Sequence, residues 1–138
     1  MLTILWVSMR KLTKMKYEKI TGDIIGAAFK VHNKLGYGFK EKHYQRAMVV
    51  ELEKLGYKIE EEFYLNIYYD DKVIGKGRAD LFVNKTILVE LKTLKELSKS
   101  DEIQLVNYLN ATRVEIGLLI NFGQTVTVKR KFRDYKKG

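Results

Sequence analysis

Residues 77–93, with the sequence GRADLFVNKTILVELKT, hold the side chains best suited to chemistry. Asp80 lies in the first half of this segment, Glu90 follows in the second half, and Lys92 comes two residues after Glu90. Two carboxylates and the backbone carbonyl of Leu91 could hold Mg²⁺ or Mn²⁺ and leave water positions open, while the lysine orients the attacking water or stabilises a charged transition state. An isolated Asp…Glu-x-Lys pattern on an exposed strand is more commonly a group of surface ion pairs, so the surroundings must decide.

The hydrophobic pattern favours one pairing of the two strands that carry these residues. With a three-residue loop at 84–86, the apolar residues share one face in these pairs: Val83–Ile87, Leu81–Val89 and Ala79–Leu91. A two-residue loop would mix charged and core side chains. The favoured register places Asp80 opposite Glu90, and Arg78 opposite Lys92, on the other face. Two facing carboxylates repel unless they are neutralised, and a divalent cation is the obvious candidate.

Periodicity along the chain predicts the elements that must position these residues. We expect two helices, then three strands, a third helix and two final strands, at residues 17–35, 40–55, 57–69, 73–83, 86–93, about 98–111, 115–122 and 125–132. This order is typical of a mixed α/β layer fold, and the helix between the third and fourth strands indicates a crossover connection. Residues 1–14 are interpreted as a flexible N-terminal extension, and 15–138 as a single domain.

Composition narrows the kinds of site that the chain can build. The chain has no cysteine and only two histidines, His32 and His43, so a bound metal would be a hard cation held by oxygen ligands. The absence of cysteine also fits a reducing cytoplasm, and we expect a cytoplasmic protein. No apolar stretch approaches the length of a membrane span.

The net charge of +9 is concentrated at the two ends of the chain. Residues 1–19 hold five basic residues and one acid, residues 129–138 hold six basic residues and one acid, and residues 20–128 are balanced. Basic ends of this kind commonly bind phosphate backbones, although they can also serve only as solvated tails.

The order of elements, with Asp and then Glu-x-Lys on the strands, resembles the restriction-endonuclease-like αβββαβ core of the PD-(D/E)xK nuclease superfamily, here with an extra N-terminal helix. The segment GFKEKHY, residues 38–44, matches the Gly-x-x-Glu-x-x-Tyr signature of the GxxExxY family. The runs ITGDIIGAAFKVHNKLG, VELKT and LLINFG are also similar to that family, so the resemblance covers about residues 16–132. Ala79 stands where the motif has proline, which carries no chemistry.

The resemblance implies roles for individual residues. Asp80 and Glu90 would be the main metal ligands, Glu41 a further ligand from a helix beside the sheet, and Lys92 the catalytic lysine. Glu41 has a simpler alternative, because an acid in a first helical turn is favoured by the helix dipole.

Further roles follow for residues around the ligands. Gln104 and Tyr108 match the Gln-x-x-x-Tyr motif of the RecB-like branch, where these residues line the site, so we count Gln104 among the catalytic residues and Tyr108 as a substrate contact. Tyr44 and Arg78 are further candidate substrate contacts, although Tyr44 could equally be a core residue. His32 is more commonly structural at a helix end.

The implied function is a Mg²⁺- or Mn²⁺-dependent nuclease that uses a metal-activated water on DNA, ahead of RNA. The alternative is a non-catalytic nucleic-acid-binding or oligomeric module on the same fold. Strand 125–132 could pair with a second copy in a homodimer. The aromatic residues of the first predicted strand could stack bases, although such clusters more commonly pack in cores and edges.

Overall fold

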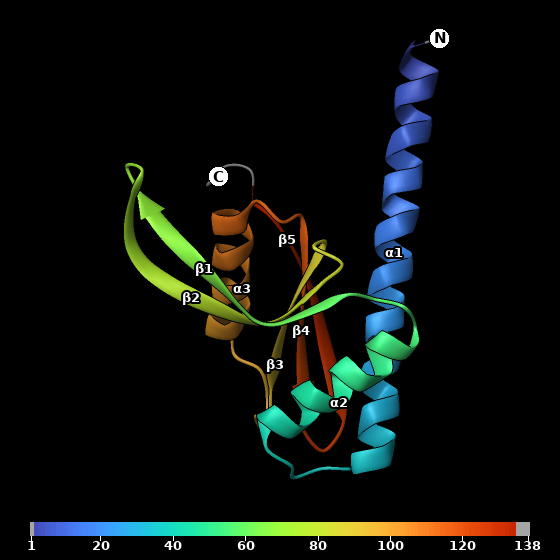
Figure 1. Ribbon diagram of the computed structural model, residues 1–138, viewed down its shortest axis with the longest axis vertical. Helices are drawn as coiled ribbons and strands as arrows, with labels where there is room; N and C mark the ends of the chain where they lie inside the picture. The colour runs from blue at the N-terminus through green and yellow to red at the C-terminus, as the bar shows by residue number, and fades with distance from the viewer. Residues whose placement is uncertain (1, 135–138) are drawn as a thin grey trace.

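The computed structural model describes residues 2–134, and its eight elements follow in the predicted order (Figure 1). They are α1 Leu2–Leu35, α2 Glu41–Lys54, β1 Ile59–Tyr69, β2 Lys72–Val83, β3 Ile87–Lys92, α3 Lys99–Thr112, β4 Ile116–Phe122 and β5 Val126–Phe132. The strands form one sheet in the order β1-β2-β3-β4-β5. Only the β3–β4 pair is parallel, and α3 connects these two strands, so the predicted crossover is confirmed.

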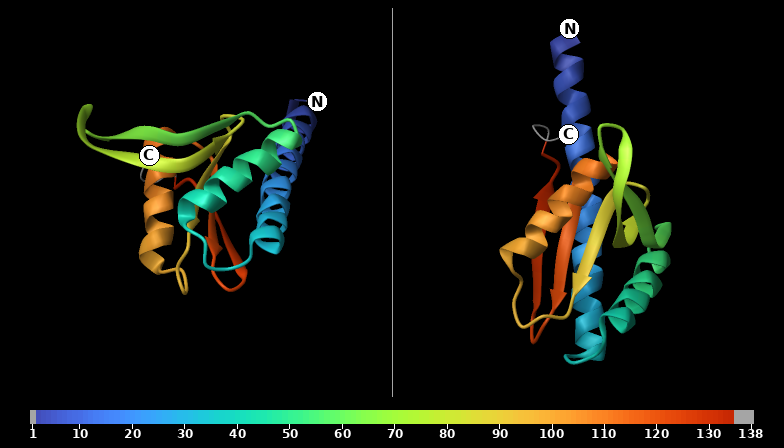
Figure 2. Two further views of the ribbon diagram at one scale, coloured as in Figure 1. Left: turned by 60° about the horizontal axis from the view of Figure 1, so that its bottom comes forward. Right: turned by 90° about the vertical axis from the view of Figure 1, so that its left-hand side faces the viewer.

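Helices cover both faces of the sheet and so create two cores (Figure 2). On one face α1 and α2 pack with side chains such as Ile24, Met48 and Leu118, and on the other α3 packs Leu105 against Leu119. Leu118 and Leu119 are neighbours in β4 and enter different cores, because successive side chains of a strand point to opposite faces. Burial on both faces explains why β4 carries no charged residue.

Helix α1 is longer than the sequence predicted. The apolar spacing indicated a start at residue 17, whereas the helix begins at Leu2, so residues 2–14 form its first turns, and their flexibility stays a prediction. These turns project past the rest of the molecule (Figure 1). The side chains of Ile4, Trp6 and Leu12 are exposed there. The helix continues there through local hydrogen bonds rather than by burying an apolar face. Despite the length of α1, no helix within the described residues has a sufficiently long apolar stretch to cross a membrane.

The predicted loop and register between β2 and β3 are confirmed for the inner part of the hairpin. The ladder contains the pairs Leu81–Val89, Phe82–Leu88 and Val83–Ile87. The loop at 84–86 is a tight turn in which Asn84 and Lys85 have φ values of 48° and 50°. Beyond Leu81 and Val89 the ladder ends, so the two strands separate at Asp80 and Glu90.

The expected pairing of Ala79 with Leu91 on one apolar face was wrong. Leu91 packs in the core beneath α1 and α2, but Ala79 packs in the core beneath α3. The change of face accompanies Glu62 of β1, which has a φ of 54° and lies between the pairs Glu61–Leu81 and Phe63–Ala79. The part of β2 before this point pairs with β1 and not with β3. The two strands form a long hairpin there that projects from the rest of the molecule (Figure 1).

Strand β5 lies at the edge of the sheet, as predicted. Within the described residues no strand pairs with its outer side. Pairing of this edge with a second copy of the chain stays a prediction.

Candidate active site

Asp80 and Glu90 lie where β2 and β3 separate, and each carboxylate bonds to the backbone of the opposite strand. Leu91 N–H donates to Asp80 Oδ2 at 2.7 Å, and Asp80 N–H donates to Glu90 Oε1 at 3.1 Å. The side chains therefore take up two backbone donors that the ladder no longer pairs, and these bonds orient both carboxylates. Both residues are almost fully buried.

Glu41 approaches the same place from another element, as the first residue of α2. An acid is favoured at this position by the helix dipole, but its surroundings go beyond that local effect. Burial raises the pKa of Glu41, and the nearby Asp80 carboxylate raises it further. The described part of the chain gives the Glu41 carboxylate no hydrogen-bond or ion-pair partner.

The electrostatics of the three carboxylates are mutually unfavourable. Burial raises the pKa of Glu90 to about 8, with repulsion by Asp80 as the next cause. Burial also raises the pKa of Asp80, although the bond from Leu91 and the charges of Arg78 and Lys92 oppose that rise. A cluster of acids whose charges are only partly relieved by neighbouring groups is typical of sites that bind a cation or transfer protons.

Two basic residues accompany the acids. Lys92 ends β3, and its charge lowers the pKa of all three carboxylates, so its ammonium lies among them. Arg78 Nη2 is 3.7 Å from Asp80 Oδ1, and Arg78 Nη1 is 3.7 Å from Glu62 Oε1. The site therefore combines two nearly buried carboxylates with a lysine and with the more exposed guanidinium group of Arg78.

Helix α3 supplies one wall of the site. Its N-terminus is closed by a capping box in which Ser98 accepts from Asp101 N–H and Asp101 accepts from Ser98 N–H. Gln104 and Tyr108 both face the cleft, as expected for residues four apart on a helix. Tyr108 fits closely over Gly77, where an added Cβ would lie 2.7 Å from the ring.

Together these residues line one open cleft of about 430 Å³. Its lining residues are Glu41, Tyr64, Lys76, Gly77, Arg78, Asp80, Glu90, Lys92, Gln104 and Tyr108. The structure thus gathers seven of the predicted site side chains in one place. Lys76 and Gly77 were not predicted, and Tyr64 was considered only as one of several aromatic residues. Strand alternation could have indicated Tyr64 and Lys76, because both lie on the same face of the hairpin as Arg78, whereas Gly77 lines the cleft through its contact with Tyr108.

Tyr44 requires a correction, because the expected substrate contact is a core residue. Its ring is fully buried and stacks on Phe122 with centroids 4.4 Å apart. Its hydroxyl donates to Gly36 O at 2.6 Å and accepts from Phe39 N–H at 3.3 Å. Tyr44 therefore stabilises the turn that precedes α2, the helix that begins with Glu41. His32 is also structural, with Nε2 2.9 Å from Gly123 O.

The donor set suits a hard divalent cation, since every candidate ligand is an oxygen. Beside their backbone bonds, Glu90 keeps its second oxygen free of hydrogen bonds within the described residues, whereas Asp80 Oδ1 is 3.7 Å from Arg78 Nη2 and would have to exchange that ion pair for a cation. Within residues 2–134, however, no three acidic or histidine side chains stand close enough to enclose an ion as they are. Binding would therefore use two carboxylates with other oxygens, such as the Leu91 carbonyl, or an inward movement of Glu41.

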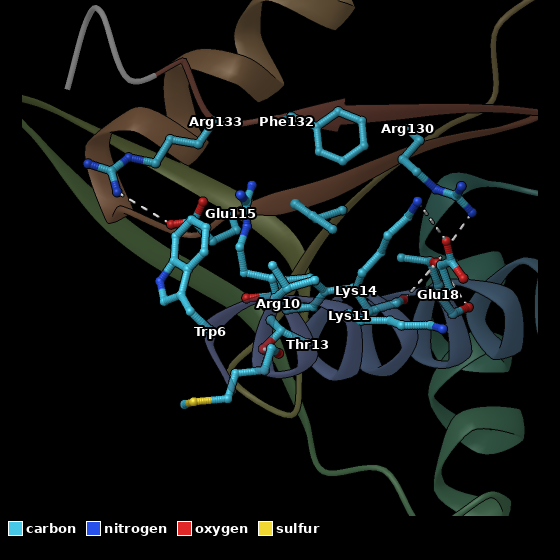
Figure 3. A pocket seen from close by; sticks show the side chains of 15 residues that line it. Trp6, Arg10, Lys11, Thr13, Lys14, Glu18, Glu115, Arg130, Phe132 and Arg133 are labelled. Carbon is cyan, nitrogen blue, oxygen red and sulfur yellow. Dashed lines mark hydrogen bonds and ion pairs between the residues drawn. The ribbon is translucent and has the colours of Figure 1, made fainter. Parts of the chain in front are cut away.

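A larger groove, of about 1130 Å³, lies between the first half of α1 and the edge strand β5 (Figure 3). It joins the two basic ends of the chain, because Arg10 and Lys14 line it together with Arg130 and Arg133. Its acids are neutralised by neighbours: Glu18 pairs with Lys14, and Glu115 with Arg133. The groove lacks the unrelieved carboxylates of the cleft, so it is not the candidate active site. Phosphate binding by the basic ends stays a prediction.

Comparison with known proteins places the chain in a family. A family model described as "PD-(D/E)XK nuclease superfamily" matches residues 18–134. No curated protein matches the chain significantly. A solved structure described as "Crystal structure of SSO0001" is similar with a TM-score of 0.46 and 20% identity, over 77% of this chain.

The chain spans 61% of the length of that solved structure. The mixed sheet with its αβββαβ core has the restriction-endonuclease-like architecture. Because the family model covers nearly every element that forms the sheet and the cleft, the chain belongs to the PD-(D/E)XK nuclease superfamily.

Proposed function

We propose that this protein is a nuclease that hydrolyses phosphodiester bonds of DNA, or of RNA, with Mg²⁺ or Mn²⁺. The observation that carries the proposal is the convergence of Asp80, Glu90 and Glu41 with Lys92 in one cleft. The carboxylates repel one another there, and a divalent cation would relieve that repulsion.

In the proposed reaction Asp80 and Glu90 are the main ligands, and Glu41 and the Leu91 carbonyl complete the set. When bound, the cation would neutralise charge on the scissile phosphate and lower the pKa of a water molecule. Lys92 orients that water and stabilises the negative charge that develops on the phosphate oxygens. The bonds from Leu91 and Asp80 N–H keep the two carboxylates in fixed orientations throughout.

The walls of the cleft hold the substrate in this proposal. Gln104 and Tyr108 on α3 contact the nucleotide next to the scissile bond, and Arg78 contacts a phosphate. The positions of Gln104 and Tyr108 in the cleft support assignment to the RecB-like branch. The position of Glu41 supports assignment to the GxxExxY family.

Calorimetric titration of Mg²⁺ and Mn²⁺ tests the ligand set. We expect binding by the native protein and none by Asp80→Asn, whose amide oxygen can still accept from Leu91 N–H and preserve the strand geometry. Glu51→Gln is the matched control, because Glu51 is an almost buried acid of α2 outside the cleft, and it should bind metal normally.

Cleavage of labelled single-stranded DNA, duplex DNA and RNA then tests the reaction. We expect turnover with Mg²⁺ or Mn²⁺, none in EDTA and none by Asp80→Asn. Metal binding equal in Asp80→Asn and native protein would refute the ligand set. Nucleic-acid binding that ignores EDTA, without cleavage of any substrate, would indicate a non-catalytic binding module instead.

A further inference from the structure

Past the point where β2 separates from β3, β1 and β2 continue together as a hairpin, residues 63–79, here called the arm. The arm has two contrasting faces. Phe63 and Leu65 point toward α3, and Leu65 is buried. Tyr64, Asn66 and Tyr68 alternate with them and are exposed. Tyr64 keeps 68% of its surface accessible and Tyr68 keeps 55%, so these rings do not pack in a core. The expectation that such aromatics pack in cores and edges therefore holds here only in its second part, because both rings lie on the edge strand β1.

The exposed face also carries basic residues from β2. Arg78 pairs across the arm with Tyr64, and Lys76 pairs with Asn66, so these four side chains lie on the same face. Asn66 Nδ2 donates to the Tyr68 hydroxyl at 3.3 Å, which places Tyr68 there too. We call these five residues the arm surface. It alternates aromatic rings with cations and contains no acid.

The arm surface is continuous with the candidate active site. Tyr64, Lys76 and Arg78 line the cleft together with Asp80, which follows Arg78 on the same strand. From Tyr64 the surface continues to Tyr68, roughly 13 Å farther along the strand at about 3.3 Å per residue. A chain whose phosphate sits at the carboxylates can therefore extend along the arm.

From this arrangement we propose that the arm surface binds unpaired nucleotides and guides a single strand into the cleft. This inference rests on the proposed nuclease function and names its substrate class as single-stranded or locally unpaired nucleic acid. Tyr64 and Tyr68 stack on bases, and Lys76 and Arg78 contact phosphates. Stacking requires an open base face, which a duplex covers with neighbouring base pairs, so the aromatic rings select unpaired strands.

Anisotropy of a labelled single-stranded oligonucleotide, measured in EDTA so that nothing is cleaved, tests the proposal. We expect Tyr64→Ala and Tyr68→Ala each to weaken binding roughly 5- to 100-fold, and Tyr64→Phe to bind normally because stacking is kept. Tyr69→Ala is the matched control, since Tyr69 is also 68% exposed and strand alternation puts the neighbour of Tyr68 on the opposite face. Both alanine substitutions are at exposed positions, so circular dichroism should be unchanged.

Two further readouts separate stacking from a general loss of affinity. An oligonucleotide with abasic sites should bind native protein more weakly, and Tyr64→Ala should weaken that binding no further. Lys76→Ala should lower the slope of log affinity against log salt by about 0.7, whereas Lys85→Ala, an exposed lysine in the β2–β3 loop, should leave the slope unchanged.

The proposal is overturned if the alanine variants bind single strands like native protein, or if Tyr69→Ala weakens binding equally. It is also overturned if the variants instead dissociate an oligomer in sedimentation, which would make the arm a protein interface. Because cleavage is blocked in these measurements, they test the arm proposal separately from the nuclease proposal. If the native protein cleaves DNA but the arm variants bind normally, only the arm proposal is refuted. If the native protein cleaves nothing but the arm variants bind more weakly, the arm proposal stands and the nuclease proposal is refuted.

Discussion

Two glutamates with almost equal exposure, 7% for Glu51 and 6% for Glu90, have opposite protonation behaviour. Hydrogen bonding from Lys30 is the main cause that lowers the pKa of Glu51 to about 2. The Glu51 carboxylate also has ion pairs with lysines of α1 and α2, at 2.9, 3.5 and 3.3 Å to Lys30, Lys34 and Lys54. Among residues 2–134 Glu90 has no ion pair of this kind, and burial followed by the charge of Asp80 raises its pKa to about 8 although the charge of Lys92 opposes the rise.

The difference shows that low exposure alone does not define a functional acid. The Glu51 carboxylate joins α1 to α2 and is satisfied by the protein itself. The Glu90 carboxylate lies beside like charges that the described part of the chain compensates only in part. The repulsion lowers stability, and binding of a cation or a proton would relieve it. Three substitutions, which give four predictions, test this contrast.

The largest effect is expected for Glu90→Gln on catalysis. The amide oxygen can still accept from Asp80 N–H, so the local geometry survives while a charged ligand is lost. We expect turnover to fall on the order of 10³-fold or more. Single-turnover cleavage assays with Mg²⁺ and Mn²⁺ measure this, and a variant that cleaves at the native rate would remove Glu90 from the site.

The same substitution should raise stability at high pH. The Glu90 carboxyl keeps its proton up to a pKa of about 8 in the folded protein but loses it near 4.5 when unfolded. Unfolding therefore releases a proton between these values, and rising pH favours the unfolded state. Glu90→Gln lacks this penalty and should be more stable by on the order of a few kcal/mol at pH 9, with no gain below pH 4.5.

Denaturant unfolding of both proteins across pH 4–9 measures the gap. A gap that is constant with pH would mean that the charge of Glu90 is already compensated in the native protein.

The converse is expected for Glu51→Gln, which removes the acid among three lysines. The variant should melt lower, on the order of 5 °C at pH 7, and cleave normally below its Tm. Because the pKa of Glu51 is lowered in the folded state, its contribution is present above pH 4.5 and is lost as the pH falls toward 2. The Tm values of the native protein and of Glu51→Gln should therefore differ at pH 7 and lie much closer together at pH 2.5. A Tm difference at pH 2.5 as large as that at pH 7 would contradict this role.

The smallest effect concerns the wall of the cleft. Gly77→Ala would place a Cβ 2.7 Å from the Tyr108 ring, which must then move. We expect a loss of activity of roughly 10-fold with little change in Tm, as for displacement of a group that only positions substrate. In a Tyr108→Ala background the added methyl group should have no further effect. Additive losses in the double variant would show that Gly77 acts independently of Tyr108.

Much of the fold could be predicted because its signals are local. Helical spacing marked the buried residues of α1, such as Ile24 and Val31, and alternation marked β5 as an edge strand. The start of α1 was missed because residues 2–14 bury little and carry no periodic apolar signal. Glu41 and Tyr44 share one short motif and lie one turn apart, yet one lines the cleft and the other the core.

Loop length and the apolar pattern of adjacent strands predict the register of the β2–β3 hairpin, and that register brings Asp80 and Glu90 together with Lys92. Three features are not predictable from local patterns: the strands separate at the carboxylates, Ala79 changes face, and the arm extends the cleft. The tertiary structure also brings the two basic ends into one groove. The physical reason is that register depends on neighbouring residues, whereas separation and docking depend on sheet twist and packing between segments distant in sequence.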